Sequence, residues 1–314
     1  MNASDCIEVS GVEKSFGDTH AVRNLDLRVP RGSLCGFLGP NGAGKSTTIR
    51  MLMSIIRPDA GSIRVLGGDA LAHKDQIGYL PEERGVYRKM RVGEFLRFVS
   101  RLKGVPRNGL NNRIQGWLER IELGGAFRKR CEELSKGMQQ KVQFLASVIH
   151  EPELIILDEP FSGLDPVNAM LLNQIITELH QEGRTILFST HVLHQAERMC
   201  DRIILIDNGE KLLDDTLENI RRQFDPRTVT VEPLKDHAGF IEEASKIDGV
   251  IASRTDSEGR IHFSIGPEHD QATCMQTLLT VAPVRSIELG RTDLDEVFVR
   301  LVGTSDQDRT LQHV

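Results

Sequence analysis

The hydrophobic positions in the first two thirds of the chain predict an α/β core. Residues 7–29 have the character of strands with a turn at Gly17-Asp18, which indicates an N-terminal antiparallel β part. Short apolar runs without alternation are typical of strands buried on both faces of a parallel sheet; they occur at Ser33–Leu38, Leu154–Leu157, Thr185–Phe188 and Ile203–Ile206. Helical patterns at Lys45–Ser54 and 168–181 follow two of these runs, as in a parallel α/β unit.

Residues 84–150 have a different character and predict a mainly helical insert. Apolar residues recur at helical spacing in Val92–Leu102 and Ile114–Ile121, and again after Leu134. Such spacing places the apolar side chains on one face of each helix.

The character of the sequence changes again near Pro226. Residues 228–290 alternate strand-like and helix-like pieces in the order β-α-β-β-α-β, which predicts a small ferredoxin-like α+β domain. A short helix at Leu294–Leu301 is expected to close this domain. Residues 304–314 are expected to form a polar tail. The predicted boundaries are therefore 5–222 for the first domain and 226–303 for the second.

Composition limits the partners more than the fold. The formal net charge of −6 argues mildly against nucleic acid as the main partner, because phosphate backbones require clustered Lys and Arg. The five cysteines are widely spaced, without zinc or redox spacing, and are expected to be free thiols in a reducing cytosol. No signal-peptide pattern and no apolar run of about 18 residues is present. We therefore expect any membrane-spanning part to be a separate protein.

A glycine-rich loop follows the apolar run at Ser33–Leu38 and matches the P-loop pattern in full. Its glycines let backbone N–H groups converge on phosphate, and the helix that follows adds the positive end of its dipole. Lys45 is predicted to reach the β- and γ-phosphates, and Ser46 to offer its hydroxyl to Mg²⁺. The alternative is a Gly-rich turn with a chance Lys-Ser, which the preceding strand and following helix disfavour. The predicted nucleotide-binding residues are Gly39, Pro40, Asn41, Gly42, Ala43, Gly44, Lys45, Ser46 and Thr47.

A pair of carboxylates ends the apolar run at Leu154–Leu157. Because α/β sheets bind ligands at the carboxyl ends of their strands, Asp158 is predicted to hold Mg²⁺ and Glu159 to act as general base for the attacking water. Alone this pair is a weak signal, since acidic residues often begin loops. His191 follows the strand at Thr185–Thr190 and is predicted to contact the γ-phosphate or orient the water, although a lone histidine is more often structural.

Two further motifs make the sequence resemble the ATP-binding subunits of ABC transporters over residues 5–220. Leu134-Ser-Lys-Gly-Met138 resembles the ABC signature, and Ser162-Gly-Leu-Asp165 resembles the D-loop of that family. The joint order of P-loop, signature, acidic pair, D-loop and histidine is highly specific. The subgroup that the chain resembles is related to bacterial sodium and multidrug exporters, whose ATPases carry an extra C-terminal domain.

The resemblance implies a mechanism and several site residues. Phe16 would stack on adenine, with a core phenylalanine as the alternative reading. Ser135 and Gly137 would bind the γ-phosphate held by a second ATP-binding subunit, and Asp165 would contact that subunit's P-loop. Two ATP molecules would lie between two subunits, most simply a homodimer, which closes on ATP and opens after hydrolysis.

The sequence departs from the family pattern at two motifs. The signature has Lys136 and Met138 where Gly and Gln are usual. Glu82, in Ile77-Gly-Tyr-Leu-Pro-Glu82, stands where the family usually has Gln. A carboxylate is a stronger Mg²⁺ ligand than an amide but repels a γ-phosphate. We therefore expect Glu82 to contact the metal directly, against the alternative of a tolerated change in a flexible loop.

The resulting prediction is an ATPase that uses ATP and Mg²⁺ to power export through a separate permease. It would be cytoplasmic and peripheral on the inner face of the cell membrane, with no nucleic acid expected as a partner. The apolar residues Phe95, Phe98 and Leu102 are expected either to line a groove for a helix of the permease or only to pack the insert. The alternative function is a soluble ABC ATPase acting on nucleic acid or ribosomes, but this chain has one cassette and no heptad run.

Overall fold

The computed structural model describes residues 5–83, 85–234 and 238–311. The chain divides into two compact units. One consists of the residues up to Leu217 together with the end of the chain from Arg300, and the other is Glu218–Val299. The division after Leu217 falls slightly before the boundary expected from the sequence. Each unit has its own hydrophobic core, so each is described by itself.

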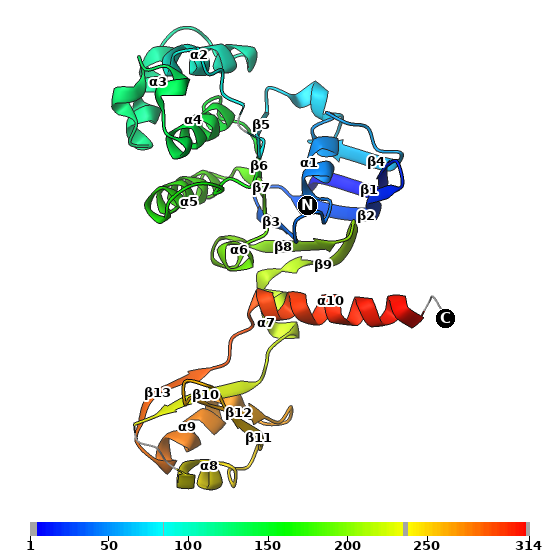
Figure 1. Ribbon diagram of the computed structural model, residues 1–314, viewed down its shortest axis with the longest axis vertical. Helices are drawn as coiled ribbons and strands as arrows, with labels where there is room; N and C mark the ends of the chain where they lie inside the picture. Colours follow the sequence, from blue (N-terminus) through cyan, green and yellow to red (C-terminus); the bar gives the residue numbers. More distant parts are fainter. Residues whose placement is uncertain (1–4, 84, 235–237, 312–314) are drawn as a thin grey trace. The chain divides into compact units, whose positions relative to one another are not determined.

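A six-stranded sheet forms the centre of the first unit, in the order β5-β6-β7-β3-β8-β9 (Figure 1). Neighbouring strands are parallel except β9, which is antiparallel to β8. Every residue of β3, β6 and β7 is buried, which explains their unbroken apolar runs. The strands are β3 (Leu34–Leu38), β5 (Ile77–Leu80), β6 (Leu154–Asp158), β7 (Thr185–Thr190), β8 (Arg202–Asp207) and β9 (Glu210–Thr216).

A second, antiparallel sheet of three strands confirms the predicted N-terminal β part. Its order is β2-β1-β4. Helix α1 (Lys45–Leu52) lies between the two sheets (Figure 1), and one hydrophobic core joins residues of both sheets and of α1. The P-loop is therefore held between two packed layers. The strands are β1 (Asp5–Phe16), β2 (Thr19–Pro30) and β4 (Ala60–Val65).

Helices cover the other side of the six-stranded sheet and form the predicted insert. Helices α5 (Pro166–Gln181) and α6 (Leu193–Met199) lie on the face opposite α1 (Figure 1). The insert contains α2 (Val92–Leu102), α3 (Leu110–Arg120) and α4 (Lys136–Val148). Short 3₁₀ helices occur at Ala70–His73, Gly124–Ala126 and Cys131–Glu133. Over the described ranges, no helix combines the length and the apolar character needed to cross a membrane.

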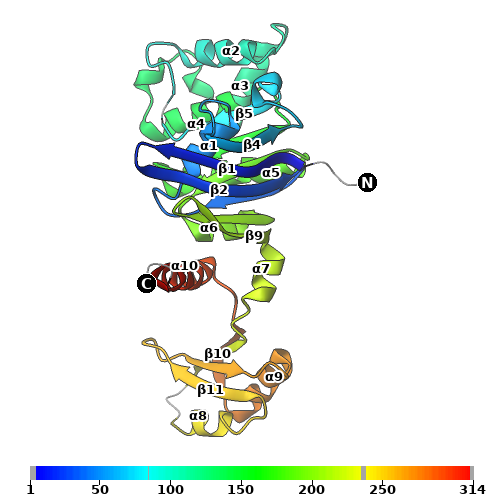
Figure 2. The ribbon, with the colours of Figure 1, turned by 90° about the vertical axis from the view of Figure 1, so that its right-hand side faces the viewer.

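The second unit has the predicted ferredoxin-like arrangement (Figure 2). Its four strands pair antiparallel in the order β11-β12-β10-β13. Helix α8 connects β10 to β11, and helix α9 connects β12 to β13, as in a ferredoxin-like fold. Apolar residues of α8 and α9 share one core with the inward positions of β10 and β12. The elements are β10 (Thr228–Pro233), α8 (Ala238–Ala244), β11 (Val250–Thr255), β12 (Ile261–Ile265), α9 (Gln271–Val281) and β13 (Val284–Leu289).

The ends of this unit differ from the sequence-based expectation. Helix α7 (Leu217–Gln223) precedes β10, and α10 is Leu294–Leu311 rather than Leu294–Leu301. The part of α10 from Arg300 belongs to the first unit, so the helix does not simply close the second one. The expected polar tail is therefore corrected: residues 304–311 continue the helix, and 312–314 lie outside the described residues. Polar residues do not stop a helix unless they break its geometry, and Gly303 costs only about 1 kcal/mol. The five cysteines are all buried and free.

Candidate functional site

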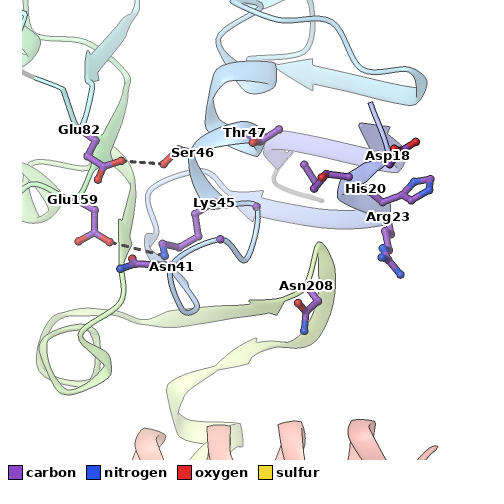
Figure 3. Close-up of a pocket in the computed structure, with 14 residues that line it drawn as sticks. Asp18, His20, Arg23, Asn41, Lys45, Ser46, Thr47, Glu82, Glu159 and Asn208 are labelled. Atoms are coloured by element: carbon purple, nitrogen blue, oxygen red, sulfur yellow. Dashed lines mark hydrogen bonds and ion pairs between the residues drawn. The ribbon is translucent and has the colours of Figure 1, made fainter. Parts of the chain in front are cut away.

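A polar cavity of about 610 Å³ opens beside the P-loop of the first unit (Figure 3). Its walls come from the P-loop and the start of α1, from the β1–β2 turn and the start of β2, and from the loops after β5, β6 and β8. This is the carboxyl edge of the parallel strands, where α/β folds bind ligands. The lining residues are Asp18, Thr19, His20, Ala21, Arg23, Asn41, Gly42, Gly44, Lys45, Ser46, Thr47, Glu82, Glu159 and Asn208.

The P-loop conformation depends on glycine at the point where α1 begins. Gly44 has φ +102° and caps the helix, and a Cβ built on it would lie 2.4 Å from the carbonyl oxygen of Ala21. Any side chain at this position would therefore force the loop away from β2. The loop leaves fully buried β3 and enters α1, so the cavity that it lines lies at a helix N-terminus.

Lys45 is the buried cation of the cavity. Its Nζ donates to the carbonyl oxygens of Gly39 at 2.7 Å and Pro40 at 3.0 Å. It also lies 3.9 Å from Oε1 of Glu159 (Figure 3). Burial lowers the pKa of Lys45, while nearby carboxylates including Asp158 act in the opposite direction. The ammonium group thus rests on its own loop, within reach of an anion that enters the cavity.

Ser46 joins two carboxylates from different strands. Its Oγ lies 3.4 Å from Oδ1 of Asp158 and 3.4 Å from Oε2 of Glu82, and its single proton can be donated to either. Burial raises the pKa of Asp158, because the ionised form is disfavoured away from water. One hydroxyl and two carboxylates are hard oxygen donors, which fit Mg²⁺.

No group of three or more His, Cys, Asp or Glu side chains suited to a metal ion occurs in the part of the chain that the structure describes. Mg²⁺ sites of nucleotide enzymes commonly use one or two carboxylates and take their remaining ligands from phosphates and water. The residues around Ser46 therefore suit a metal that arrives with a nucleotide better than a resident metal centre.

Glu159 lines the cavity, and His191 contacts its carboxylate. Nδ1 of His191 lies 2.9 Å from Oε1 of Glu159, and the His191 side chain is half exposed. Glu159 itself has φ +49°, a left-handed conformation that is uncommon for a residue other than glycine. Such backbone strain is typical of positions that hold a functional side chain in place.

The residues of the predicted signature and D-loop lie at two helix N-termini and do not line this cavity. Ser135 caps α4, where its Oγ accepts from the N–H of Met138 at 3.3 Å. Asp165 caps α5 by accepting from the N–H of Asn168 at 2.9 Å, which lowers its pKa. A Cβ built on Gly137 would lie 3.5 Å from Cδ2 of Leu164, so the two segments are neighbours. Their proposed contacts would be made to another subunit.

Phe16 lies outside the group of residues that line the cavity. Its side chain is 52% exposed, and Nζ of Lys14 lies 5.5 Å from its ring centroid. This exposure disfavours the reading of Phe16 as a core residue. Its predicted stacking on adenine stays a prediction.

Sequence reasoning missed the polar wall opposite Lys45. Asp18, His20, Arg23 and Asn208 line this side of the cavity (Figure 3). One available signal was the Asn208-Gly209 pair, whose positive φ values of +49° and +81° form the tight turn between β8 and β9. The other was the predicted turn at Asp18, immediately after Phe16.

Two buried glutamines of α4 were also missed. Gln143 donates to the carbonyl oxygens of Pro81 at 3.2 Å and Glu83 at 3.0 Å, the residues on either side of Glu82. Gln140, one turn away, donates to the carbonyl oxygen of Pro160, next to Glu159, at 3.2 Å. Both side chains are at most 5% exposed. Helix α4, which begins at the predicted signature, is thus hydrogen-bonded to the loop that carries Glu82 and to the loop that carries Glu159.

Both units of the chain match known protein families. The family described as "ABC transporter" matches residues 22–162. The family described as "ATP-binding protein DrrA1-3-like, C-terminal domain" matches residues 216–302. Together they cover most of both units.

Individual relatives match nearly the whole chain. The ABC transporter ATP-binding protein YhaQ of Bacillus subtilis is 38% identical over 304 residues, covering 95% of this chain and 98% of the relative. The daunorubicin/doxorubicin resistance ATP-binding protein DrrA of Streptomyces peucetius is 33% identical, covering 98% and 95% respectively. A solved structure described as the ATP binding subunit of an ABC transporter is 33% identical with a TM-score of 0.65, covering 70% of this chain and 93% of that one.

Proposed function

The chain belongs to the family of ABC transporter ATP-binding proteins and is an ATPase, and from this premise we propose that it powers export through a separate membrane-spanning permease. It would act in the cytoplasm, at the inner face of the cell membrane. The similarity to a drug-resistance ATP-binding protein along both units supports export as the direction.

The observation that carries this proposal is a cavity lined by the P-loop and Glu159, with Asp158 in contact with Ser46 and His191 in contact with Glu159. Lys45 would neutralise the β- and γ-phosphates, and Glu159 would accept the proton of the attacking water while His191 holds its carboxylate. Bound Mg²⁺ would supply further neutralisation of the phosphate charge. Ser46, Asp158 and Glu82 are the residues that would hold the metal.

The proposed active unit is a homodimer with two ATP molecules between its subunits. The N-terminus of α4, which carries Ser135 and Gly137, would bind the γ-phosphate held by the partner, by the same anion attraction that the P-loop uses. Asp165, at the start of α5 beside this segment, would contact the partner's P-loop. When the dimer closes on ATP, each cavity would gain the signature segment of the other subunit.

An apolar groove of about 320 Å³ is the proposed docking site for a helix of the permease. Phe95, Phe98 and Leu102 all line the groove, together with Tyr87. Phe95 is 3% exposed and also packs the insert, while Phe98, Leu102 and Tyr87 are 39%, 64% and 55% exposed. Exposed apolar side chains around a hollow are typical of an interaction site.

Dimerisation of purified Glu159→Gln protein tests the ATP sandwich. We expect size-exclusion chromatography with light scattering to show a dimer with ATP and a monomer without it. Ser135→Arg in the same background should abolish the dimer but keep ATP binding, because a long cation would block the α4 N-terminus. A monomer under all conditions would contradict self-pairing.

Co-purification from membranes tests the groove. We expect the wild-type chain to co-purify with the membrane fraction. The variants Phe98→Asp and Leu102→Asp should be lost from that fraction but keep their own ATPase activity. Leu71→Asp, which replaces another exposed leucine at 62% exposure outside the groove, is the matched control and should stay bound. Equal release by all three variants would contradict the docking site.

A further inference from the structure

One buried hydroxyl contacts both members of the acidic pair. Ser189 lies on β7, directly opposite Asp158 in the parallel register with β6, and is 0% exposed. Its Oγ donates to Oδ1 of Asp158 at 2.6 Å and accepts from the backbone N–H of Glu159 at 3.1 Å. These two hydrogen bonds use the one proton and one of the lone pairs of the hydroxyl.

Each of these bonds meets a need of its partner. The Asp158 carboxylate is 2% exposed, and burial disfavours its ionised form unless donors surround it. The N–H of Glu159 leaves the β-ladder at the point where the backbone turns to φ +49°, so it requires a partner outside the regular sheet. A single serine provides both.

The end of β7 therefore fixes Glu159 from two sides. Ser189 holds its backbone, and His191, two residues later on the same strand end, contacts its carboxylate at 2.9 Å. We propose that Ser189 is a positioning residue that sets Asp158 and Glu159 relative to each other, so that the metal-binding oxygen and the base keep their separation during hydrolysis. This inference rests on the roles proposed above for those two residues.

Kinetics of Ser189→Ala against Mg²⁺ and ATP test the proposal. We expect kcat to fall about 10- to 100-fold and the Mg²⁺ concentration for half activity to rise about fivefold, because two partners lose a buried hydrogen bond. Binding of Mg²⁺-free ATP should be unchanged, since the P-loop is not touched. Ser189→Thr keeps the hydroxyl and should recover most of the activity.

Ser100→Ala is the matched control. Ser100 is also 0% exposed, but its Oγ donates to Leu96 within α2, far along the chain from the cavity residues. Ser100→Ala removes a buried hydroxyl without unpairing a carboxylate or a backbone N–H, and it should leave the Mg²⁺ curve unchanged. If the added methyl prevents Ser189→Thr from folding, Ser189→Cys keeps the size and a weak donor, and should give intermediate activity.

Ser189→Ala in Glu159→Gln protein distinguishes the positioning role of Ser189 from the proposed base role of Glu159. In Glu159→Gln protein, Ser189→Ala should shift Mg²⁺ binding as before but cause no further loss of kcat. Wild-type kcat and an unchanged Mg²⁺ curve in Ser189→Ala would overturn the positioning role. Full activity of Glu159→Gln alone would instead remove the proposed base, and the Mg²⁺ curve would then decide whether Ser189 acts through Asp158.

Discussion

The two units of this chain treat polar side chains in opposite ways. The first unit buries Lys45, Asp158, Glu159 and Ser189 at the carboxyl edge of its parallel sheet. The second fills its core with aliphatic and aromatic residues plus Cys274, and among its described residues only Thr292 is a buried polar side chain. Burying polar groups costs stability unless they are satisfied, so their concentration in one unit marks where the chemistry takes place.

Polar residues of the second unit form a network near its surface instead. Asp256 lies 3.0 Å from Nε2 of His262, whose Nδ1 lies 3.0 Å from Oγ1 of Thr230. The hydrogen bond from His262 and others from Arg260 hold the pKa of Asp256 well below its usual range. This arrangement satisfies charges beside water.

Exchanging one carboxylate for an amide in each unit gives the largest expected contrast. Glu159→Gln should lower kcat about 10²- to 10³-fold, because it removes the proposed general base. Asp256→Asn should leave kcat within about twofold, because Asp256 bonds to Arg260 and His262 of its own unit. Steady-state ATPase assays measure both. A comparable loss in Asp256→Asn would break the division of roles.

Core truncation tests whether the units are energetically separate. Phe263→Ala should destabilise the second unit by about 3–4 kcal/mol, since the ring is fully buried. Trp117, the single tryptophan, and both tyrosines lie in the first unit. Circular dichroism in urea should therefore show an early transition that tryptophan fluorescence does not.

Phe188→Ala is the counterpart in the first unit and should move the fluorescence transition instead. If Phe263→Ala shifted the Trp117 midpoint as much as the circular dichroism, the two units would unfold as one.

Replacing Gln143 asks whether buried polar groups outside the cavity also serve the chemistry. Gln143→Leu should raise the Mg²⁺ concentration for half activity about three- to tenfold, because the backbone on both sides of Glu82 loses its donor. Glu82→Gln should also raise the Mg²⁺ concentration for half activity. In the double variant the increase in free-energy terms should be smaller than the sum of the two single effects. Gln174→Leu, an exposed glutamine of α5, is the control.

An unchanged Mg²⁺ curve in Glu82→Gln would contradict direct contact between Glu82 and the metal. Strict additivity of Gln143→Leu and Glu82→Gln would show that Gln143 acts elsewhere.

Acid sensitivity of the first unit is the smallest effect predicted. Burial and nearby Lys103 lower the pKa of His150 to about 4, and its Nδ1 has no partner among the described residues. Between about pH 6.5 and pH 4 the unfolded chain binds a proton at His150 and the folded chain does not. The stability of the folded chain should therefore decrease as the pH is lowered through this window. The loss should be on the order of 1–2 kcal/mol, since His150 is partly exposed.

Urea unfolding followed by Trp117 fluorescence between pH 4 and 7 measures this slope. His150→Gln should flatten it, and an unchanged slope would assign the acid sensitivity to other groups.

The sequence predicted those elements whose pattern does not depend on distant partners. β3 and β6 are short runs buried on both faces, and α2 has the bounds expected from its apolar spacing. β4 was missed because most of its positions are exposed and carry no apolar pattern. The length of α10 was missed because polar composition was taken for a tail.

The same limit applies to the site. Lys45, Asp158 and Glu159 stand in local motifs that any sequence reader can find, and the structure brings Lys45 and Glu159 within 3.9 Å. Ser189 and Gln143 carry no motif, since one is a serine inside an apolar strand and the other a glutamine on a helix. Their importance arises only from β7 lying beside β6 and from α4 lying over the loop after β5.

The sheet order has a consequence for synthesis of the chain on the ribosome. β3 leads into the P-loop, yet its two neighbours in the sheet, β7 and β8, are made long after it. Until Thr190 has emerged neither edge of this apolar strand has its partner, and until Asp207 has emerged one edge stays unpaired. Unpaired edges invite aggregation. The strand that leads into the nucleotide-binding loop therefore gains its place in the sheet only after most of the first unit has been made.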